Sequence, residues 1–317
     1  MVVNDSARVA APSRNLTHSF VLIAGIGLIT ALSAYVLWGR AGVAWTFALS
    51  FVLLLISPRI TPEVIIRMYG AQRVDQRFGA PLLRGVEELA RRAGLPSVPK
   101  IFIIPTPMLN AFATGTQSDS VIAVTQGMLK ALSSREISAV LAHEMAHIRH
   151  NDLWVMNLAD TLSRFTHLMS MMGVLLFLFN LPLLFMGGAP FPWLGIVLLY
   201  LAPTISSLLQ LGLSRAREYE ADHAGAQLSG DPEGLASALQ KIEKYQGGMW
   251  ERVFLPGRRV PVPSLLRTHP PTKERIRRLR QLHETPRQPV HVSQAQDVAA
   301  HYPTRQRPRY HLNGLWY

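Results

Sequence analysis

Two uncharged apolar runs lie near the start of the chain, over Ser19–Trp38 and Gly42–Ile56. Twenty helical residues cross roughly 30 Å of hydrocarbon, so the first run is long enough to span a bilayer. A Gly-Arg-Ala-Gly segment at 39–42 separates the two runs and predicts a turn. We therefore expect a transmembrane helical hairpin over residues 19–58, preceded by a short N-terminal segment, 1–18.

A cleaved signal peptide is the alternative interpretation of the first run. The apolar core of a signal peptide is about 7–15 residues long. This run is longer and a second span follows it, which favours a helix that is kept in the membrane.

A third apolar region extends from Phe165 to Ser214 without one charged residue. A Gly-Gly-Ala-Pro segment at 187–190 lies near its middle and predicts a second turn. Two helices, about His167–Met186 and Phe191–Leu213, fit the length. A helical hairpin buried inside a soluble protein is the alternative, but so long a stretch without a charge favours the membrane.

Basic residues flank the predicted hairpins on one side. The two hairpin tips contain only Arg40, whereas the outer ends of the spans carry Arg8, Arg14, Arg59, Arg67, Arg73, Arg77, Arg84, Arg149, Arg164, Arg215 and Arg217. The positive-inside rule then places both termini and the segment between the hairpins in the cytoplasm. Four spans satisfy that arrangement, and the lipid bilayer is the first partner we expect.

Composition agrees with this division into apolar and charged parts. Hydrophobic residues make up 49% of the chain and charged residues 16%, against about 25% charged in soluble domains. The net charge of +12 can indicate nucleic acid as a partner, but no nucleic-acid-binding motif is present, so we expect none. Because the chain has no cysteine, any metal must be held by His, Asp or Glu.

Two charged segments, 59–164 and 215–285, are predicted to form one cytoplasmic domain with a small sheet. The Ser-x-x-Glu pattern at 133–136 is typical of a capping box and predicts a helix through His150. The polar tail at 286–317 is predicted to be disordered. The remaining predicted helices are Thr61–Tyr69, Pro81–Ala93, Ala216–Leu228, Glu233–Tyr245 and Thr272–His283, and the predicted strands are Lys100–Ile104 and Val121–Thr125.

The helix after the capping box carries the chemistry, because it contains the motif His143-Glu144-Met145-Ala146-His147. Histidines at i and i+4 share one helix face, so both imidazoles can bind one ion. The intervening Glu144 is placed to take a proton from a metal-bound water without binding the metal. The alternative is a solvated helix with incidental histidines, but the cap and the apolar opposite face count against it.

Catalytic zinc needs a third protein ligand and an open position for water. The metzincin extension is excluded, because Leu153 stands where its third histidine would be. His150, one turn beyond His147, would point past the ion. Glu218 and Asp222 are better candidates at i and i+4, since one carboxylate can bind zinc while the other hydrogen-bonds a ligand histidine. The alternative is a solvated charged face whose carboxylates pair with Arg215 and Arg217.

These motifs, taken in order, resemble those of the HtpX-like membrane zinc endopeptidases, relatives of the CAAX prenyl proteases. The resemblance covers residues 15–285. It is carried by Ala93-Gly94-Leu95-Pro96, Asn110-Ala111-Phe112-Ala113-Thr114-Gly115, the His143 motif, the run 214–222 (Ser-Arg-Ala-Arg-Glu-Tyr-Glu-Ala-Asp) and Thr268-His269-Pro270-Pro271. It implies a gluzincin-type α+β catalytic domain in a mainly helical, multi-pass protein of the bacterial inner membrane.

The resemblance also implies roles for individual residues. Glu218 would be the third ligand of one Zn²⁺, and Asp222 would hold the ligands in place by hydrogen bonding without binding the metal itself. His269 and Arg275 would lie near the scissile carbonyl and stabilise the oxyanion. Residues Asn110–Gly115 would form an edge where an extended substrate pairs by β-augmentation. From the residues alone, His269 is only a turn histidine and Arg275 only a surface charge.

Three functions remain open. The first is an ATP-independent endopeptidase that cuts unfolded or damaged membrane and cytoplasmic polypeptides, since the chain contains no phosphate-binding loop of the Walker type. The second is a dedicated processing protease for prenylated C-termini, which four spans rather than a larger chamber disfavour. The third is a non-catalytic scaffold or chaperone with structural zinc, for which Glu144 would have no use.

Overall fold

The computed structural model describes residues 11–56, 69–186, 193–253, 272–282, 288–290, 292 and 295–302. The chain divides into two compact units. The first, here called the helical unit, comprises Met1–Arg59 and Trp154–Arg217. The second, the sheet unit, comprises Ile60–Leu153 and Glu218–Tyr317.

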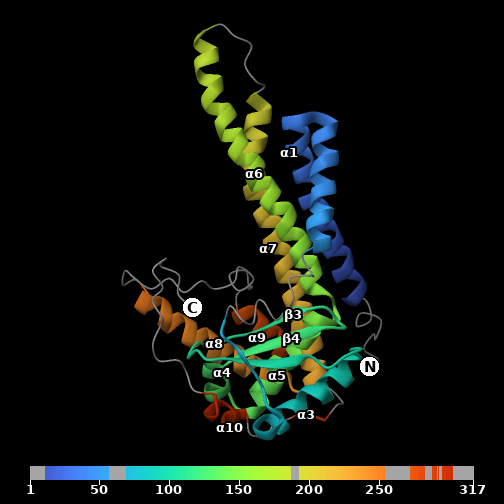
Figure 1. The fold of residues 1–317 in the computed structure, drawn as a ribbon, viewed down its shortest axis with the longest axis vertical. Coiled ribbons are helices and arrows are strands. Elements are labelled where there is room, and N and C mark those ends of the chain that lie inside the picture. Colours follow the sequence, from blue (N-terminus) through green and yellow to red (C-terminus); the bar gives the residue numbers. More distant parts are fainter. Residues whose placement is uncertain are drawn as a thin grey trace, which may run out of the picture. The chain divides into compact units, whose positions relative to one another are not determined.

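The helical unit contains α1 (Ala11–Ile56) and the apolar parts of α6 (Asp152–Phe185) and α7 (Trp193–Ser229). Gly39 interrupts α1 with φ 61° and ψ −152°, a conformation that residues with a Cβ rarely adopt. This break falls at the turn predicted from the sequence, and Figure 1 shows α1 as two helical parts on either side of it.

Three stretches of these helices are long and apolar enough to cross a membrane, namely Thr17–Leu53, Asp152–Pro182 and Trp193–Ser229. The first of them contains the break at Gly39. Many of their large hydrophobic side chains face outward, as Trp45 (75% exposed) and Leu194 (82% exposed) do. This outward display of apolar side chains suits a lipid environment. The predicted tip at 187–190 lies outside the described residues.

Both later helices are longer than the sequence pattern predicts. α6 starts at Asp152 rather than near His167, and α7 continues without a break from its apolar part through Ser229. A change from apolar to charged side chains does not end a helix unless a residue also interrupts the backbone hydrogen bonds. No such residue lies at the junction of Leu213 and Ser214 or between Asp152 and His167.

The sheet unit is built on a four-stranded mixed sheet of order β1-β2-β4-β3. Its strands are β1 (Gln72–Arg73), β2 (Lys100–Ile104), β3 (Ala111–Gly115) and β4 (Ser120–Thr125). β2 and β4 are parallel, and the outer pairs are antiparallel. β2 and β4 were predicted from the sequence. β3 forms one edge of the sheet, with Ala111 opposite Val124 of β4.

The sheet unit also contains the helices α3 (Gln76–Ala93), α4 (Gln126–Ala131), α5 (Ser134–Arg149), α8 (Pro232–Val253), α9 (Thr272–Arg280) and α10 (Ala295–Ala300). The predicted capping box at the start of α5 is confirmed, because Ser133 and Glu136 exchange both hydrogen bonds. α5 contacts β3 and β4 as well as α3 and α8. The predicted helix Thr61–Tyr69 lies almost wholly outside the described residues.

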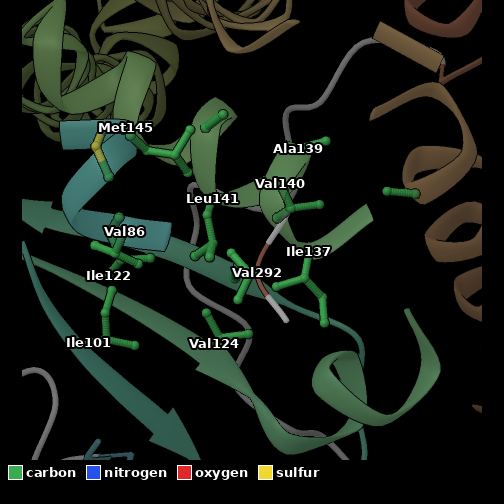
Figure 2. Close-up of a cluster of buried hydrophobic side chains, with 14 of the residues drawn as sticks. Val86, Ile101, Ile122, Val124, Ile137, Ala139, Val140, Leu141, Met145 and Val292 are labelled. Carbon is green, nitrogen blue, oxygen red and sulfur yellow. The ribbon is translucent and has the colours of Figure 1, made fainter. Parts of the chain in front are cut away.

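The core of the sheet unit lies between α5 and the sheet. Figure 2 shows Ile137 and Leu141 of α5 directed toward Ile122 and Val124 of β4. All four side chains are almost fully buried. One face of α5 is therefore packed against the inner strand β4, and the histidine motif lies on the same helix.

The tail is not uniformly disordered, which corrects the prediction for residues 286–317. Val292 is fully buried among core residues, and its N–H donates a 2.7 Å hydrogen bond to the Ser138 hydroxyl of α5. Val298 of α10 is also fully buried. Val290 and Val292 each stand between polar residues or proline, so the local pattern does not show that they fit the core.

Candidate metal centre

α5 brings two imidazoles together. His143 and His147 lie one helical turn apart, and their Nε2 atoms are 3.2 Å from each other. The His143 side chain is buried and that of His147 nearly so. Two imidazole nitrogens can approach this closely when the N–H of one donates to the lone pair of the other, or when both bind one metal ion.

α7 supplies the third group. Glu218 Oε2 lies 3.6 Å from His143 Nε2, and Glu218 Oε1 lies 3.7 Å from His147 Nε2. One ligand atom from each of the three residues falls within 4.8 Å of the others. Ligand atoms at about 2.0–2.1 Å from a tetrahedral Zn²⁺ are about 3.3 Å apart. The donor set and its spacing therefore fit a zinc ion.

A buried arginine forms ion pairs with two carboxylates of α7. Arg275 of α9 donates to Asp222 through Nε (2.7 Å) and one terminal nitrogen (2.6 Å), and its other terminal nitrogen lies 3.0 Å from Glu218 Oε2. Arg275 is only 4% exposed. Asp222 in turn lies 3.1 Å from Nδ1 of His143, at the distance of an ion pair. Asp222 is thus the partner of His143 and of Arg275.

A close approach of α7 to α5 makes these contacts possible. Glu218, Asp222 and Gly225 lie on one face of α7, at i, i+4 and i+7. A Cβ on Gly225 would come within 2.8 Å of the Cα of His143. The absence of a side chain there lets the two backbones meet, so that Glu218 and Asp222 reach the histidines.

Asp152 completes the surroundings of the two histidines. Its Oδ2 atom is 2.7 Å from Nδ1 of His147, and the residue is 2% exposed. Sequence reasoning assigned it no role. The sequence does contain a hint of this role, because Asp152 lies five positions after His147. It directly follows Asn151, a residue type that tolerates a left-handed turn.

The charges in the pocket shift pKa values in opposite directions. Burial lowers the pKa of His147, but the hydrogen bond to Asp152 and the charges of Glu218, Asp152 and Glu144 outweigh it and raise that pKa to about 9. Burial raises the pKa of Asp222, but the charge and hydrogen bonds of Arg275 lower it by more. The net pKa is therefore lowered, and the carboxylate stays ionised. The pocket is therefore rich in negative charge and suited to a cation.

The remaining predicted residues have different outcomes. Glu144 lies on α5 between the two histidines and is partly exposed. His150 caps the C-terminus of α5 and is not part of the three-residue group. β3, which includes the predicted edge residues from Ala111 to Gly115, contacts α5. His269 lies outside the described residues.

Two imidazoles on one helix and a carboxylate from a second helix form a group that could hold a metal ion, as in sites of the metallopeptidase type. Comparison with known proteins agrees with that class. The family model of peptidase family M48 matches residues 80–283. The chain therefore belongs to peptidase family M48.

Curated relatives extend the similarity beyond the site. A protease HtpX homolog of Ralstonia pickettii is 35% identical, over 87% of this chain and 99% of the relative. One from Methylibium petroleiphilum is 36% identical, over 84% and 96% respectively. The crystal structure of S. mikatae Ste24p has a TM-score of 0.49 and 23% identity, covering 87% of this chain and 66% of that one. Together with the apolar helices, the family and the relatives identify a membrane-bound metalloprotease.

Proposed function

We propose that the chain is a zinc-dependent endopeptidase that cuts unfolded or damaged membrane and cytoplasmic polypeptides without ATP. One observation carries this proposal, namely the convergence of His143, His147 and Glu218 beside Glu144. A structural zinc site is closed by four protein ligands, whereas these three leave a position for water.

Zinc bound there would supply a Lewis acid and a water of lowered pKa. Glu144 would act as the general base that takes a proton from the attacking water, and would later deliver that proton to the leaving amine. The chain of contacts from Arg275 through Asp222 to His143 holds one ligand imidazole in place, and the contact from Arg275 to Glu218 holds the third ligand. The main role that we propose for Arg275 is therefore to orient the metal ligands.

Substrate polypeptide would bind as an added strand along β3. This strand is the outermost of the sheet on its side and contacts α5. A bound segment would gain main-chain hydrogen bonds from residues Asn110–Gly115 whatever its sequence, which suits unfolded substrates. His269 is proposed to face the scissile carbonyl and stabilise the oxyanion together with Arg275, on the resemblance described above.

We further propose four spans, with the two parts of α1 on either side of Gly39 counted separately. The basic residues at the outer ends of these spans support a cytoplasmic site and cytoplasmic termini. The relatives are bacterial proteases, which supports the inner membrane as the location.

The decisive test is cleavage of an unfolded model protein, such as reduced casein, by detergent-purified protein with zinc. Glu144→Gln is expected to retain zinc but to lose about 10²–10⁴-fold in rate, the usual contribution of a positioned general base. Glu87→Gln, on the exposed face of α3, is the matched control and keeps the native rate. Equal cleavage by the Glu144 variant would refute the assignment.

A parallel assay with a prenylated peptide separates the alternatives. Cleavage of that peptide alone would favour the processing protease. Cleavage of neither substrate, with zinc bound, would favour the scaffold.

A further inference from the structure

The turn between α5 and α6 places the carboxylate of Asp152 against His147 of α5. The His150 N–H donates to Ala146 O at 3.0 Å and closes the last turn of α5. Asn151 then adopts φ 55°, which Asn tolerates better than most residues. Because this reversal takes only two residues, α6 begins at Asp152 directly beside the second histidine of the motif.

The contact made there is directional. At 2.7 Å, Asp152 Oδ2 and His147 Nδ1 are at the distance of a charge-assisted hydrogen bond. An imidazole whose Nδ1 donates to a carboxylate keeps its other nitrogen free to bind a metal. That other nitrogen, Nε2, is the one that faces His143 and Glu218.

We propose that Asp152 is a positioning residue, which holds the His147 ring through Nδ1 so that Nε2 is presented to the metal. This inference rests on the proposed metal centre. Each ligand histidine then has its own carboxylate, since Asp222 lies beside Nδ1 of His143. The two carboxylates come from different helices, because Asp152 is the first residue of α6 and Asp222 lies in the last turns of α7.

Asp152 also has a structural role that must be separated from this one. An acidic residue in the first turn stabilises a helix through its macrodipole. Asn and Ser are both well tolerated at helix starts, but neither offers a carboxylate to His147. Asp152→Asn and Asp152→Ser therefore keep the start of α6 and remove only the charged acceptor.

The experiment measures zinc affinity of the full-length protein in detergent by competition with a chromophoric chelator. Both variants are expected to bind zinc about 10–100-fold more weakly than the native protein, the usual effect of removing such a partner. The Co²⁺-substituted variants should also show altered absorption, which a purely structural role would not produce. Asp160→Asn, an ion-paired acidic residue two turns further along α6, is the matched control and keeps native affinity.

Unfolding temperatures of the metal-free variants complete the test. A lower unfolding temperature with native zinc affinity, in both variants, would mean that Asp152 only starts α6 and would overturn the inference. A native protein that binds no zinc would overturn the proposed centre itself, and this inference with it.

Discussion

The two units of this chain place their apolar side chains in opposite ways. Among the described residues, every large hydrophobic side chain that is more than 60% exposed belongs to the helical unit. In the sheet unit, the largest cluster of buried residues fills the space between α5 and the sheet. The first unit thus depends on its surroundings to cover its surface, whereas the second buries its own core.

Their buried polar groups differ in the same way. In the helical unit the buried pairs include neutral hydroxyls, such as Thr30 with Thr166 and Ser163 with Ser206. In the sheet unit they include charged groups, such as Asp222 with Arg275. Charged buried pairs are costly to break because the remaining charge stays desolvated. Equivalent substitutions should therefore have large effects in the sheet unit and small ones in the helical unit.

The largest effect is expected from Gly225→Ala. The new Cβ would lie within 3.0 Å of the backbone of His143, which cannot yield as a flexible side chain can. We expect unfolding to become easier by about 1–3 kcal/mol, as in other overpacked cores. Displacement of Glu218 should also lower the cleavage rate by about 10²-fold. Thermal unfolding and casein cleavage measure the two effects.

The matched control is Gly27→Ala in α1, where a Cβ would meet no atom within 4 Å. Its cleavage rate should stay at the native value and its unfolding temperature should not fall, because Ala is favoured over Gly in a helix by about 0.5–1 kcal/mol. An effect as large as that of Gly225→Ala would mean that the helical unit is packed as tightly as the sheet unit, contrary to the comparison.

The next effect concerns Glu136, which is 4% exposed and joins α5 to α8. It accepts hydrogen bonds from Ser237 (2.6 Å), Lys241 (2.7 Å) and the Ser133 N–H (2.7 Å). Burial raises the pKa of Glu136, but these hydrogen bonds outweigh it and the net pKa is lowered. Glu136→Gln is expected to cost about 1.5–3 kcal/mol at neutral pH, because hydrogen bonds to a charged group are lost.

The pH dependence of that cost follows from the direction of the shift. A carboxyl group whose pKa is lower in the folded state stabilises above its unfolded pKa, and this contribution is lost as pH falls through the folded value. The difference between native and Glu136→Gln proteins should therefore shrink on acidification. Glu88→Gln, in a more exposed pair with Arg91 and Arg92, should cost less than about 1 kcal/mol throughout. A difference for Glu136→Gln that does not change with pH would contradict this account.

The sequence predicts best where a signal is local. The capping box at Ser133, the break at Gly39 and strands β2 and β4 each depend on a few adjacent residues, and the structure contains them all. The spacing of His143 and His147 is local in the same sense. The third ligand was not local in this sense. The spacing left Glu218 and Asp222 as alternatives, and only the family resemblance selected Glu218.

What the pattern did not predict depends on contacts distant in sequence or on backbone conformation. Val292 fits a core pocket beside Gly85, and no local pattern reveals a pocket built by another helix. Asp152 was missed because its role depends on the two-residue reversal at His150 and Asn151, which turns it toward His147. Arg275 was read from its residues as a surface charge, since its carboxylate partners lie on α7, more than fifty positions earlier.

The smallest effect is expected between α1 and α6 in the helical unit. Thr30 is fully buried and its hydroxyl lies 3.0 Å from that of Thr166. Thr166 also donates to the Leu162 carbonyl at 3.0 Å, so it keeps a partner when Thr30 is replaced by Val. A double-mutant cycle with Thr30→Val and Thr166→Val should give a coupling energy of about 0.6 kcal/mol, the average for interhelical hydrogen bonds in membranes. Unfolding in mixed micelles measures it. A coupling above about 2 kcal/mol would exceed the range for such bonds. It would show that the polar contacts of the helical unit stabilise it as strongly as the charged network stabilises the sheet unit.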